Sequence, residues 1–431
     1  MRRTAKYIFI FFLILSAVAI KRDLKSDIKA SEYIENYKFV VERIDYSSDY
    51  VNLYSKNVKV SLRNDEKIEE NFAGFNAGDI LYISGAFKNT LRFENLGYGL
   101  YLKGIGTDYA VNPKIVKLAG TEKNANYYIN LLRNKIAVSI RSLYGENYPF
   151  VEALLLGIRD DLDSDINALL SKTGIVHIIS ISGFHIIIVA AIIEKSLFFM
   201  PKRPRYFAVL AVTLFYVLLT GMSTPCFRAY FFYLLYVLSV LFCKRYDTMS
   251  AGFILASAYM FLNPYIIFNI SFCLSFLSVF SIAMYYSRLK NLIEKFDFCK
   301  SHKYISEGMA LTVSAQILTA PYVYYYFSIF SNVSILSNLI CAPLISFSFP
   351  FIILSLAVIK ILPLAKIFAL AASFLIDLFM LLNQVLANLP HAYHIFQKPY
   401  LSIALFLYII ILAENKFYTR RKLKENKIEQ S

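Results

Sequence analysis

Apolar runs long enough to cross a membrane recur along this chain, above all after residue 174. About 20 mostly apolar residues in a helix match the roughly 30 Å hydrocarbon core of a bilayer. The pattern predicts ten spans, at residues 7–20, 175–193, 206–222, 226–243, 249–262, 264–286, 308–330, 332–358, 361–389 and 399–413. Pro343 and Pro350 cannot donate a helical hydrogen bond, so we expect a local break in the eighth span.

Residues 31–120 show a different pattern, in which apolar and polar positions alternate. The stretches "YKFVVERIDYSSDYVNLYS" and "VKVSLR" are typical of half-buried strands between short turns. Five or so short strands predict a small β-barrel, OB-like in type, whose usual ligands are oligonucleotides or oligosaccharides. The alternative is a barrel that only braces the membrane part.

Residues 121–173 have helical periodicity and predict an amphipathic connector lying near the bilayer. Four acids follow each other closely here, at Asp160, Asp161, Asp163 and Asp165. They could hold a divalent cation, but we expect Asp163 or Ser164 to cap a short helix, "DINALLSK", that closes at Gly174.

Composition and charge support a membrane protein and give it an orientation. The 431 residues are 57% hydrophobic and 17% charged, with mean hydropathy +0.51. Such a composition has too few polar residues to cover the surface of a soluble globular protein. Lysine and arginine concentrate in alternate loops, which are expected to be cytoplasmic. We therefore predict an anchor at 1–22, an extracytoplasmic segment 21–174 that contains the β domain, a polytopic domain at 174–413 and a basic cytoplasmic tail at 414–431, with both termini inside.

The net charge of +15 does not indicate a nucleic-acid partner by itself, because the excess lies in the predicted inner loops and tail. The outer segment 31–120 has 11 Lys plus Arg against 12 Asp plus Glu. Its overall charge gives no support for DNA binding. The five cysteines form no CxxC or Cys/His spacing, and we expect no metal and no cofactor.

Several ordered blocks of this chain resemble the ComEC family of competence proteins. The first is "ALLLGIRDDLDSDINALLSKTGIVHIISISGFHIIIVAAII"; "GMSTPCFRAYFFYLL", "NPYIIFNISFCLSFLSVFSI" and "AQILTAPYVYYYFSIFSNVSILSNLICAPLISF" follow in the family's order. Upstream, "FENLGYGLYLKGIGTDYAV" is similar to the close of the family's outer OB-like domain. The resemblance implies an inner-membrane channel of a bacterial cell that takes up single-stranded DNA during natural transformation. Members commonly end in a metallo-β-lactamase-like domain, and no HxHxDH motif occurs here, so we expect a form that lacks it.

Five candidate residues for the DNA path lie in the predicted span 175–193: His177, Ser180, Ser182, Gly183 and His185. On one continuous helix His177, Ser180 and His185 would share a face, which points to a wet cavity or to other helices. Gly183 would permit close helix approach or a break in the helix. The alternative for the histidines is interhelical hydrogen bonding that only fixes packing.

Four further polar residues lie in later spans. Arg228 could contact DNA phosphates, or its stem could extend to the interface. Gln316 and Asn338, beside prolines, could line the route or join helices. For Asp377, deep in an apolar span, we expect a gating or structural role, because an acid would repel phosphate.

The mechanism that we expect is passive conduction of single-stranded DNA rather than catalysis. No GxxxxGK[ST] loop occurs, so we expect the driving force to come from a partner, a cytoplasmic ATPase or helicase, or from the membrane potential. The other expected partners are membrane lipid, a DNA receptor, a separately encoded metallo-β-lactamase-like nuclease and a second copy of the chain in a homodimer. Two other classes stay open: an intramembrane hydrolase or transferase that uses His177, Ser182 and His185, and a secondary transporter of a small solute.

Overall fold

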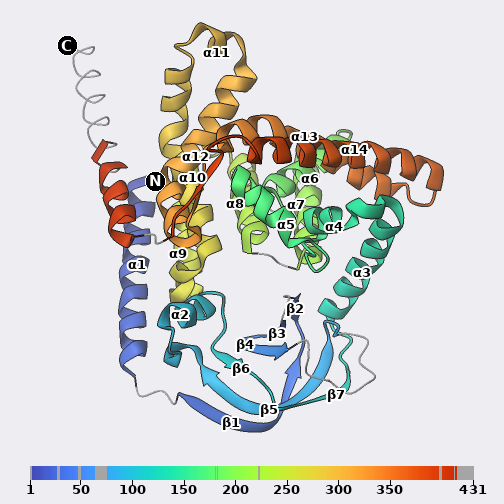
Figure 1. The fold of residues 1–431 in the computed structure, drawn as a ribbon, viewed down its shortest axis with the longest axis vertical. Helices are drawn as coiled ribbons and strands as arrows, with labels where there is room; N and C mark the ends of the chain where they lie inside the picture. The colour runs from blue at the N-terminus through green and yellow to red at the C-terminus, as the bar shows by residue number, and fades with distance from the viewer. Residues whose placement is uncertain are drawn as a thin grey trace. The chain divides into compact units, whose positions relative to one another are not determined.

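The computed structural model describes residues 2–26, 30–46, 50–63, 75–179, 181, 183–221, 224–397, 400–411 and 413–414. The chain is mostly helical and carries a small sheet domain near its N-terminus (Figure 1). It divides into two compact units. The first unit comprises Met1–Leu162, His177–Cys273 and Ser348–Phe374; the second comprises Asp163–Val176, Leu274–Phe347 and Leu375–Ser431.

The sheet of the first unit has seven described strands. They are β1 (Ser31–Val40), β2 (Arg43–Tyr46), β3 (Tyr50–Ser55), β4 (Val58–Arg63), β5 (Asp79–Asn89), β6 (Tyr109–Val111) and β7 (Ile115–Thr121). The order is β1-β5-β6-β4-β3-β2, with β7 also paired to β5. All pairs are antiparallel except β4 with β6. The predicted number of strands, about five, was therefore too low. The sequences of β6 and β7 show little alternation of apolar and polar residues, so the pattern did not reveal them.

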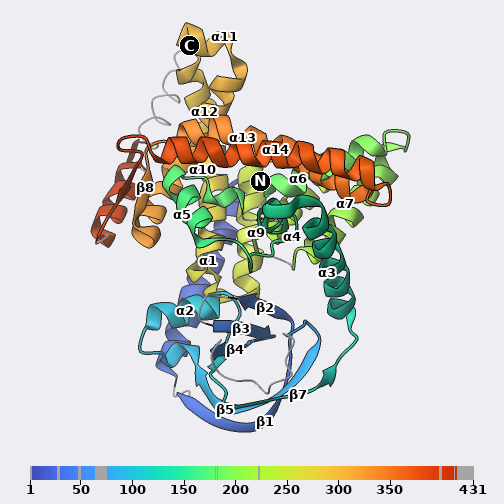
Figure 2. The ribbon, with the colours of Figure 1, turned by 45° about the vertical axis from the view of Figure 1, so that its right-hand side comes forward.

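The curved sheet encloses one apolar core (Figure 2). Leu53 of β3 and Val60 of β4 are fully buried, whereas Tyr54 and Lys59 next to them are only partly covered. Successive side chains on a strand point to opposite faces, so the alternation in the sequence sends apolar groups inward and polar groups outward. The core also contains Phe39 of β1.

Helix α2 (Leu96–Gly104) attaches this sheet to the helices of the first unit. Asn263 Nδ2 donates a hydrogen bond to the Lys103 carbonyl at 3.0 Å. A Cβ at Gly104 would lie 2.8 Å from the Tyr265 carbonyl oxygen, a distance that only glycine allows. Tyr265 belongs to the 3-10 turn η4 (Pro264–Phe268), which follows α9 (Thr248–Leu262). The sheet domain is thus held on the turn after α9.

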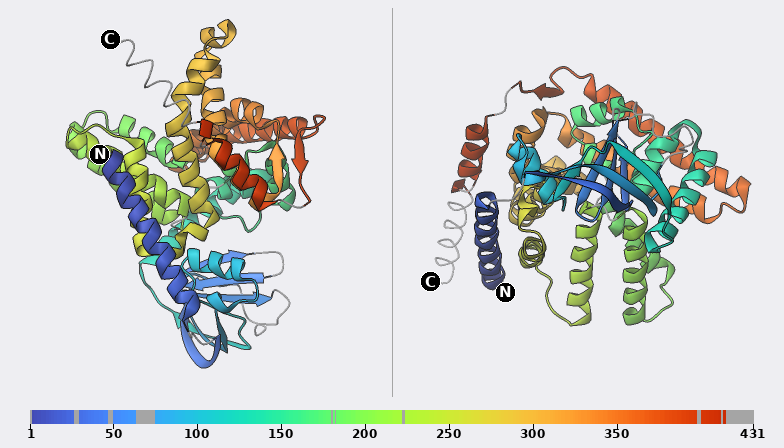
Figure 3. Two further views of the ribbon diagram at one scale, coloured as in Figure 1. Left: turned by 90° about the vertical axis from the view of Figure 1, so that its left-hand side faces the viewer. Right: turned by 90° about the horizontal axis from the view of Figure 1, so that it is seen from below.

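Among the other helices of the first unit, α1 and α8 contact α9, and α3 contacts α4 and α7. Helix α1 (Arg2–Lys25) runs along α9, where the rings of Phe9 and Phe253 are 5.3 Å apart. Helices α6, α7 and α8 contact one another (Figure 3, green to yellow-green). The bounds of the remaining helices are α3 (Ala125–Tyr144), α4 (Tyr148–Leu156), α6 (Gly183–Ser196), α7 (Lys202–Leu219) and α8 (Thr224–Leu241).

The second unit is built on long helices and a short two-stranded sheet. Its elements are α5 (Ser164–Thr173), the later part of α10 (Ile270–Ile293), α11 (Asp297–Ser301), α12 (Lys303–Phe327), β8 (Ile329–Ser331), parts of α13 (Ser334–Ala357) and α14 (Leu362–Ala387), β9 (Tyr393–Ile395) and a helix at Leu401–Ile411. Asp163 caps α5, since its side chain accepts a bond from the Asp165 amide at 3.0 Å, and α5 ends at Gly174 with φ +76°. This confirms the predicted cap.

Four described helices are long and apolar enough to cross a membrane. They are Thr4–Lys25, Ile270–Ile293, Ser334–Ala357 and Leu362–Ala387. Shorter apolar helices lie at Pro225–Leu241, Thr248–Leu262 and Leu401–Ile411.

Two predictions about the spans are wrong. Residues 175–193 do not form one helix: the 3-10 turn η3 (Val176–Ile178) is followed by α6, which begins only at Gly183. His177 and His185 therefore share no helix face. The expected break at Pro343 and Pro350 is also absent, because α13 continues through both. A proline removes one hydrogen bond without ending a helix that neighbouring contacts hold.

Candidate functional site

Three loops of the first unit meet at Gly157. This residue ends α4 in the left-handed conformation, with φ +70°, and a Cβ there would lie 2.9 Å from Ile181 Cδ1. The Thr220 carbonyl oxygen, at the end of α7, would be 3.7 Å away. The loops after α4, before α6 and after α7 are therefore in contact. We call this place the loop junction (Gly157, Ile181 and Thr220).

The loop junction joins segments that the sequence had singled out separately. Gly157 comes from "LLLGIRDD", Ile181 from "SISGFH" and Thr220 directly precedes "GMSTP". Ser180 and Ser182, two predicted path residues, lie outside the described residues. Gly183 begins α6, and a Cβ on it would lie 3.3 Å from the Cβ of Ala229 in α8. Both properties expected of Gly183 occur, since the helix begins there and approaches its neighbour closely.

The two histidines have different surroundings. His177 is exposed in η3. His185 has no exposed surface, and its ring centroid is 4.9 Å from that of Phe349 and 5.6 Å from that of Phe184. This aromatic contact fits the packing alternative for His185. The role of either histidine in a DNA path stays a prediction.

Arg228 is buried near the start of α8, with 1% of its surface exposed. Its Nη2 donates to the Ser271 carbonyl at 2.7 Å, at the beginning of α10. Within the described ranges, no acceptor lies within hydrogen-bond reach of its Nε or Nη1. Its stem does not extend to solvent here, so the interfacial alternative does not describe this structure. The remaining donors could bind an anionic or carbonyl oxygen.

Gln316 and Asn338 come together in the second unit through Ser334. Gln316 Nε2 donates to Ser334 Oγ at 2.8 Å, and Asn338 Nδ2 donates to the Ser334 carbonyl at 2.8 Å. A Cβ at Gly174 would lie 2.7 Å from Ser334 Cβ, so the end of α5 packs on the same residue. The bond of Gln316 joins α12 to α13 and fits the alternative in which this residue joins helices, whereas the bond of Asn338 stays within α13. Asp377 lies midway along α14 with an exposed side chain.

A basic and aromatic surface on the sheet domain was missed in the sequence. The Arg43 guanidinium lies 4.1 Å from the centre of the Tyr54 ring, and Lys59 Nζ lies 6.0 Å from the same centre. Lys59 also approaches the Tyr98 ring at 5.9 Å. We call this surface the basic–aromatic face; it consists of Arg43, Tyr50, Tyr54, Lys59 and Arg63 on β2–β4, with Tyr98 and Tyr101 on α2.

The register of the strands explains this face. Tyr54 pairs with Arg43 on one side and with Lys59 on the other, and Tyr50 pairs with Arg63. Tyr50 and Tyr54 are four apart on β3, and so are Lys59 and Arg63 on β4, an even spacing that puts each pair on one face of its strand. This spacing was visible in "YVNLYS" and "VKVSLR", but the balanced charge of the segment concealed the local excess. Burial, followed by the Asp45 carboxylate, raises the pKa of Tyr54 to about 12. The phenol therefore stays neutral and keeps its proton at neutral pH.

Two arginines close to the loop junction, Arg133 and Arg159, have lowered pKa values. Burial lowers the pKa of Arg133, and the carboxylates of Asp160, Asp45 and Glu152 oppose this. Partial burial also lowers the pKa of Arg159, against Asp45. Asp45 lies on β2 and pairs with Arg43 at 3.1 Å.

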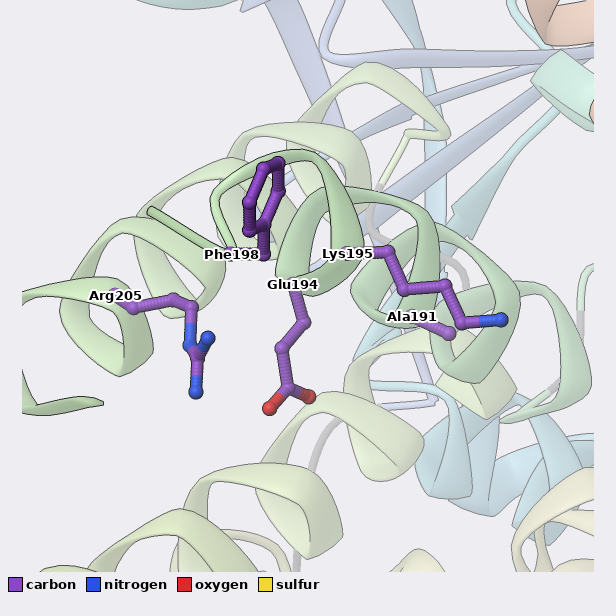
Figure 4. Close-up of a pocket in the computed structure, with 5 residues that line it drawn as sticks. All are labelled: Ala191, Glu194, Lys195, Phe198 and Arg205. Atoms are coloured by element: carbon purple, nitrogen blue, oxygen red, sulfur yellow. The ribbon is translucent and has the colours of Figure 1, made fainter. Parts of the chain in front are cut away.

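A hollow of about 370 Å³ lies elsewhere in the first unit, between the end of α6 and the start of α7 (Figure 4). Glu194 and Arg205 extend to the same side, whereas Lys195 points away from them; Ala191 and Phe198 complete the lining. It offers opposite charges but no serine, threonine or cysteine among these five residues. In the described part of the chain, no three His, Cys, Asp or Glu side chains are grouped to hold a metal ion.

Comparison with known proteins identifies relatives of this chain. A family model described as "Competence protein" matches residues 154–415. "ComE operon protein 3" of Bacillus subtilis is 27% identical over 255 residues, which cover 58% of this chain and 31% of that protein. "Recombination protein 2" of Haemophilus influenzae is 23% identical over 354 residues, 77% of this chain and 43% of that protein.

An uncharacterized protein of Aquifex aeolicus is 24% identical over 213 residues, 48% of this chain and 45% of that protein. In each case the matched part is less than half of the relative's length. No solved structure matches the chain. The matched region begins at the end of α4 and contains all three loops of the loop junction.

Proposed function

This chain belongs to the Competence protein family, and on that premise we propose that it is a bacterial inner-membrane channel for uptake of single-stranded DNA. Membership supports a role in competence and DNA uptake, and the four long apolar helices support a membrane protein. We further propose about ten spans, an OB-like closure of the sheet domain, cytoplasmic termini and an extracytoplasmic segment 21–174.

The basic–aromatic face carries the proposal. Proteins that hold single strands without sequence preference combine aromatic rings, on which bases stack, with cations that follow the phosphates. Tyr54 and Tyr98 flank Lys59 here, and Tyr98 stacks on Tyr101 with ring centroids 6.4 Å apart. Arg43 lies over the ring of Tyr54, and Arg63 lies over the ring of Tyr50 on the same face. This alternation of ring and cation suits a strand of nucleotides better than a small solute.

The strand would pass from the face toward the loop junction, where the family's loops meet. We propose conduction rather than catalysis, with His177, Gly183, His185 and Arg228 as path candidates. The proposed partners are single-stranded DNA, lipid, a DNA receptor, a cytoplasmic ATPase or helicase, a separate metallo-β-lactamase-like nuclease and a second copy of the chain.

Binding by the whole purified chain tests the proposal. The chain is reconstituted in phosphatidylcholine nanodiscs, and anisotropy of a fluorescein-labelled oligothymidylate is measured at low salt. Replacement of Tyr54 by Ala should weaken binding by about 1–3 kcal/mol, roughly five- to 150-fold, because one stacking ring is lost. Tyr82→Ala is the matched control, since Tyr82 is exposed on β5 outside the face.

The cellular arm uses a deletion strain complemented with the same variants. Labelled DNA that reaches the cytoplasm should fall with Tyr54→Ala and remain at the wild-type level with Tyr82→Ala. Equal uptake in the deletion strain and its parent would refute the proposed function.

A further inference from the structure

The hollow between α6 and α7 keeps two opposite charges apart. Glu194 near the end of α6 and Arg205 near the start of α7 both line it, and their side chains extend to the same side (Figure 4). Within the described residues, no ion pair or hydrogen bond joins these two side chains. The Lys195 side chain points away from both, so it does not neutralise the Glu194 carboxylate. The hollow therefore offers a separate anion and cation to one ligand.

Arg205 also has a donor to spare. Its Nε is buried, and no acceptor for it occurs in the part of the chain that the structure describes. A buried donor without an acceptor is costly, and a guanidinium binds phosphate through a planar fork of donors. The side chain as a whole is only partly buried, so an anion can approach it from the hollow. The Arg205 end of the hollow thus suits a phosphate group.

Exposed rings and cations border the hollow. Phe198 and Phe199, in the turn after α6, are 78% and 71% exposed, and Phe198 also lines the hollow. Lys202 and Arg203 at the start of α7 are exposed as well. Rings beside cations are typical of segments at the boundary between the headgroups and the acyl chains of a bilayer. The ligand that these surroundings favour is a phospholipid.

We propose that this hollow binds the headgroup of phosphatidylethanolamine, a phospholipid that carries one phosphate and one primary ammonium. Arg205 donates to the phosphate, Glu194 accepts from the ammonium, and an acyl chain lies along the exposed ring of Phe198. The inference rests on the proposed membrane topology, in which the basic turn between α6 and α7 lies at the cytoplasmic surface. It assigns a lipid site that the proposed DNA path does not use.

The charges of the lining favour this headgroup over two other phospholipids. The ammonium has three donors, so the headgroup satisfies Glu194 and Arg205 together. Phosphatidylglycerol would bring a phosphate near the Glu194 carboxylate without a cation to pair with it. The quaternary ammonium of phosphatidylcholine has no N–H group to donate. The volume of about 370 Å³ lies within the range of roughly 300–1,000 Å³ that is usual for ligand pockets.

Native mass spectrometry of the full chain in detergent tests the site. The chain is mixed with equal amounts of phosphatidylethanolamine, phosphatidylglycerol and phosphatidylcholine that carry the same acyl chains, and the bound fraction of each lipid is measured. The wild-type chain should retain phosphatidylethanolamine best. Arg205→Gln should weaken its binding roughly threefold to tenfold, because a partly exposed, charge-assisted contact is lost. Lys244→Gln, which removes an exposed charge from the turn after α8, should not.

Glu194→Gln separates a headgroup site from a merely basic surface. Without the carboxylate, phosphatidylethanolamine should bind roughly threefold to tenfold more weakly, since its ammonium loses a charged acceptor. Phosphatidylglycerol should bind more tightly, because the repulsion of its phosphate is removed. Thermal unfolding in detergent checks that both variants fold, and if Arg205→Gln does not, Glu194→Gln decides the matter.

The outcomes that overturn this inference leave the proposed DNA path intact. Wild-type retention of phosphatidylglycerol above phosphatidylethanolamine, or equal losses with Arg205→Gln and Lys244→Gln, would indicate attraction to the basic surface alone. Release of the lipid by free phosphoethanolamine would indicate a soluble ligand instead. Conversely, a chain that retains phosphatidylethanolamine but does not bind the labelled oligothymidylate would count against the proposed function and not against this site.

Discussion

The Cβ position of Gly157 lies 2.9 Å from Cδ1 of Ile181, and this contact brings the loop after α4 against the loop before α6. Gly157 also has φ +70°, a conformation that side chains with a Cβ rarely adopt. The conformation favours glycine at this position, and an added Cβ would also displace the end of the Ile181 side chain. The loop junction therefore depends on one residue without a side chain.

Replacement of Gly157 by Ala should destabilise the protein by about 1–3 kcal/mol, from backbone strain together with the clash on Ile181. Thermal unfolding in detergent measures the effect. Gly106→Ala is the control, because Gly106 has φ +90° and nothing within 4 Å of its Cβ position. Addition of Ile181→Val, which removes Cδ1, should restore part of the loss. Equal shifts for Gly157→Ala and Gly106→Ala would show that the contact with Ile181 has no effect.

Arg141 should be needed to hold a buried carboxylate between α3 and α4. Its Nε donates to Glu152 Oε1 at 2.8 Å, and the Glu152 side chain is only 1% exposed. Arg141→Gln should cost about 1–3 kcal/mol, less than a fully buried pair, because Arg141 itself is half exposed. Chemical denaturation of the nanodisc-bound chain measures this loss.

The pH dependence provides the check on Arg141. The hydrogen bond with Glu152 raises the pKa of Arg141 in the folded protein. The contribution of Arg141 to wild-type stability is therefore complete below its pKa in the unfolded chain, and it is lost only when the pH rises through the higher pKa of the folded protein. Wild-type stability from this pair should therefore not change between about pH 6 and 9. A double variant with Glu152→Gln should be more stable than Arg141→Gln at neutral pH; if it is not, the unpaired charge is not the cause.

Gln316 and Ser334 offer a test of path against packing. If their hydrogen bond only joins α12 and α13, Gln316→Leu and Ser334→Ala should each cost about 0.6 kcal/mol and should not add in the double variant. DNA uptake would then be unchanged. Thr319→Val is the control, because Thr319 Oγ1 donates only within α12. If Gln316→Leu folds normally but DNA uptake is lost, Gln316 lines the DNA path.

Local pattern predicted the parts of this structure that depend on neighbours in the chain. Alternation in β3 and β4 indicated which side chains face the core, and the cap of α5 at Asp163 was readable because the cap lies within the helix's own first turn. The order of motifs also indicated the family. The span at 175–193 was misread, because hydrophobicity measures transfer to lipid and does not reveal where a helix starts.

The sequence by itself determined the apolar helices, the alternating strands and the family. Only the tertiary structure decided that Gly157, Ile181 and Thr220 meet, and that Tyr98 of α2 lies beside Lys59 of β4. It also decided that the Arg133 guanidinium donates to the Leu156 carbonyl, 23 positions away along the chain. Such contacts follow from strand register, left-handed turns and close packing of distant segments, and no short stretch of sequence contains that information.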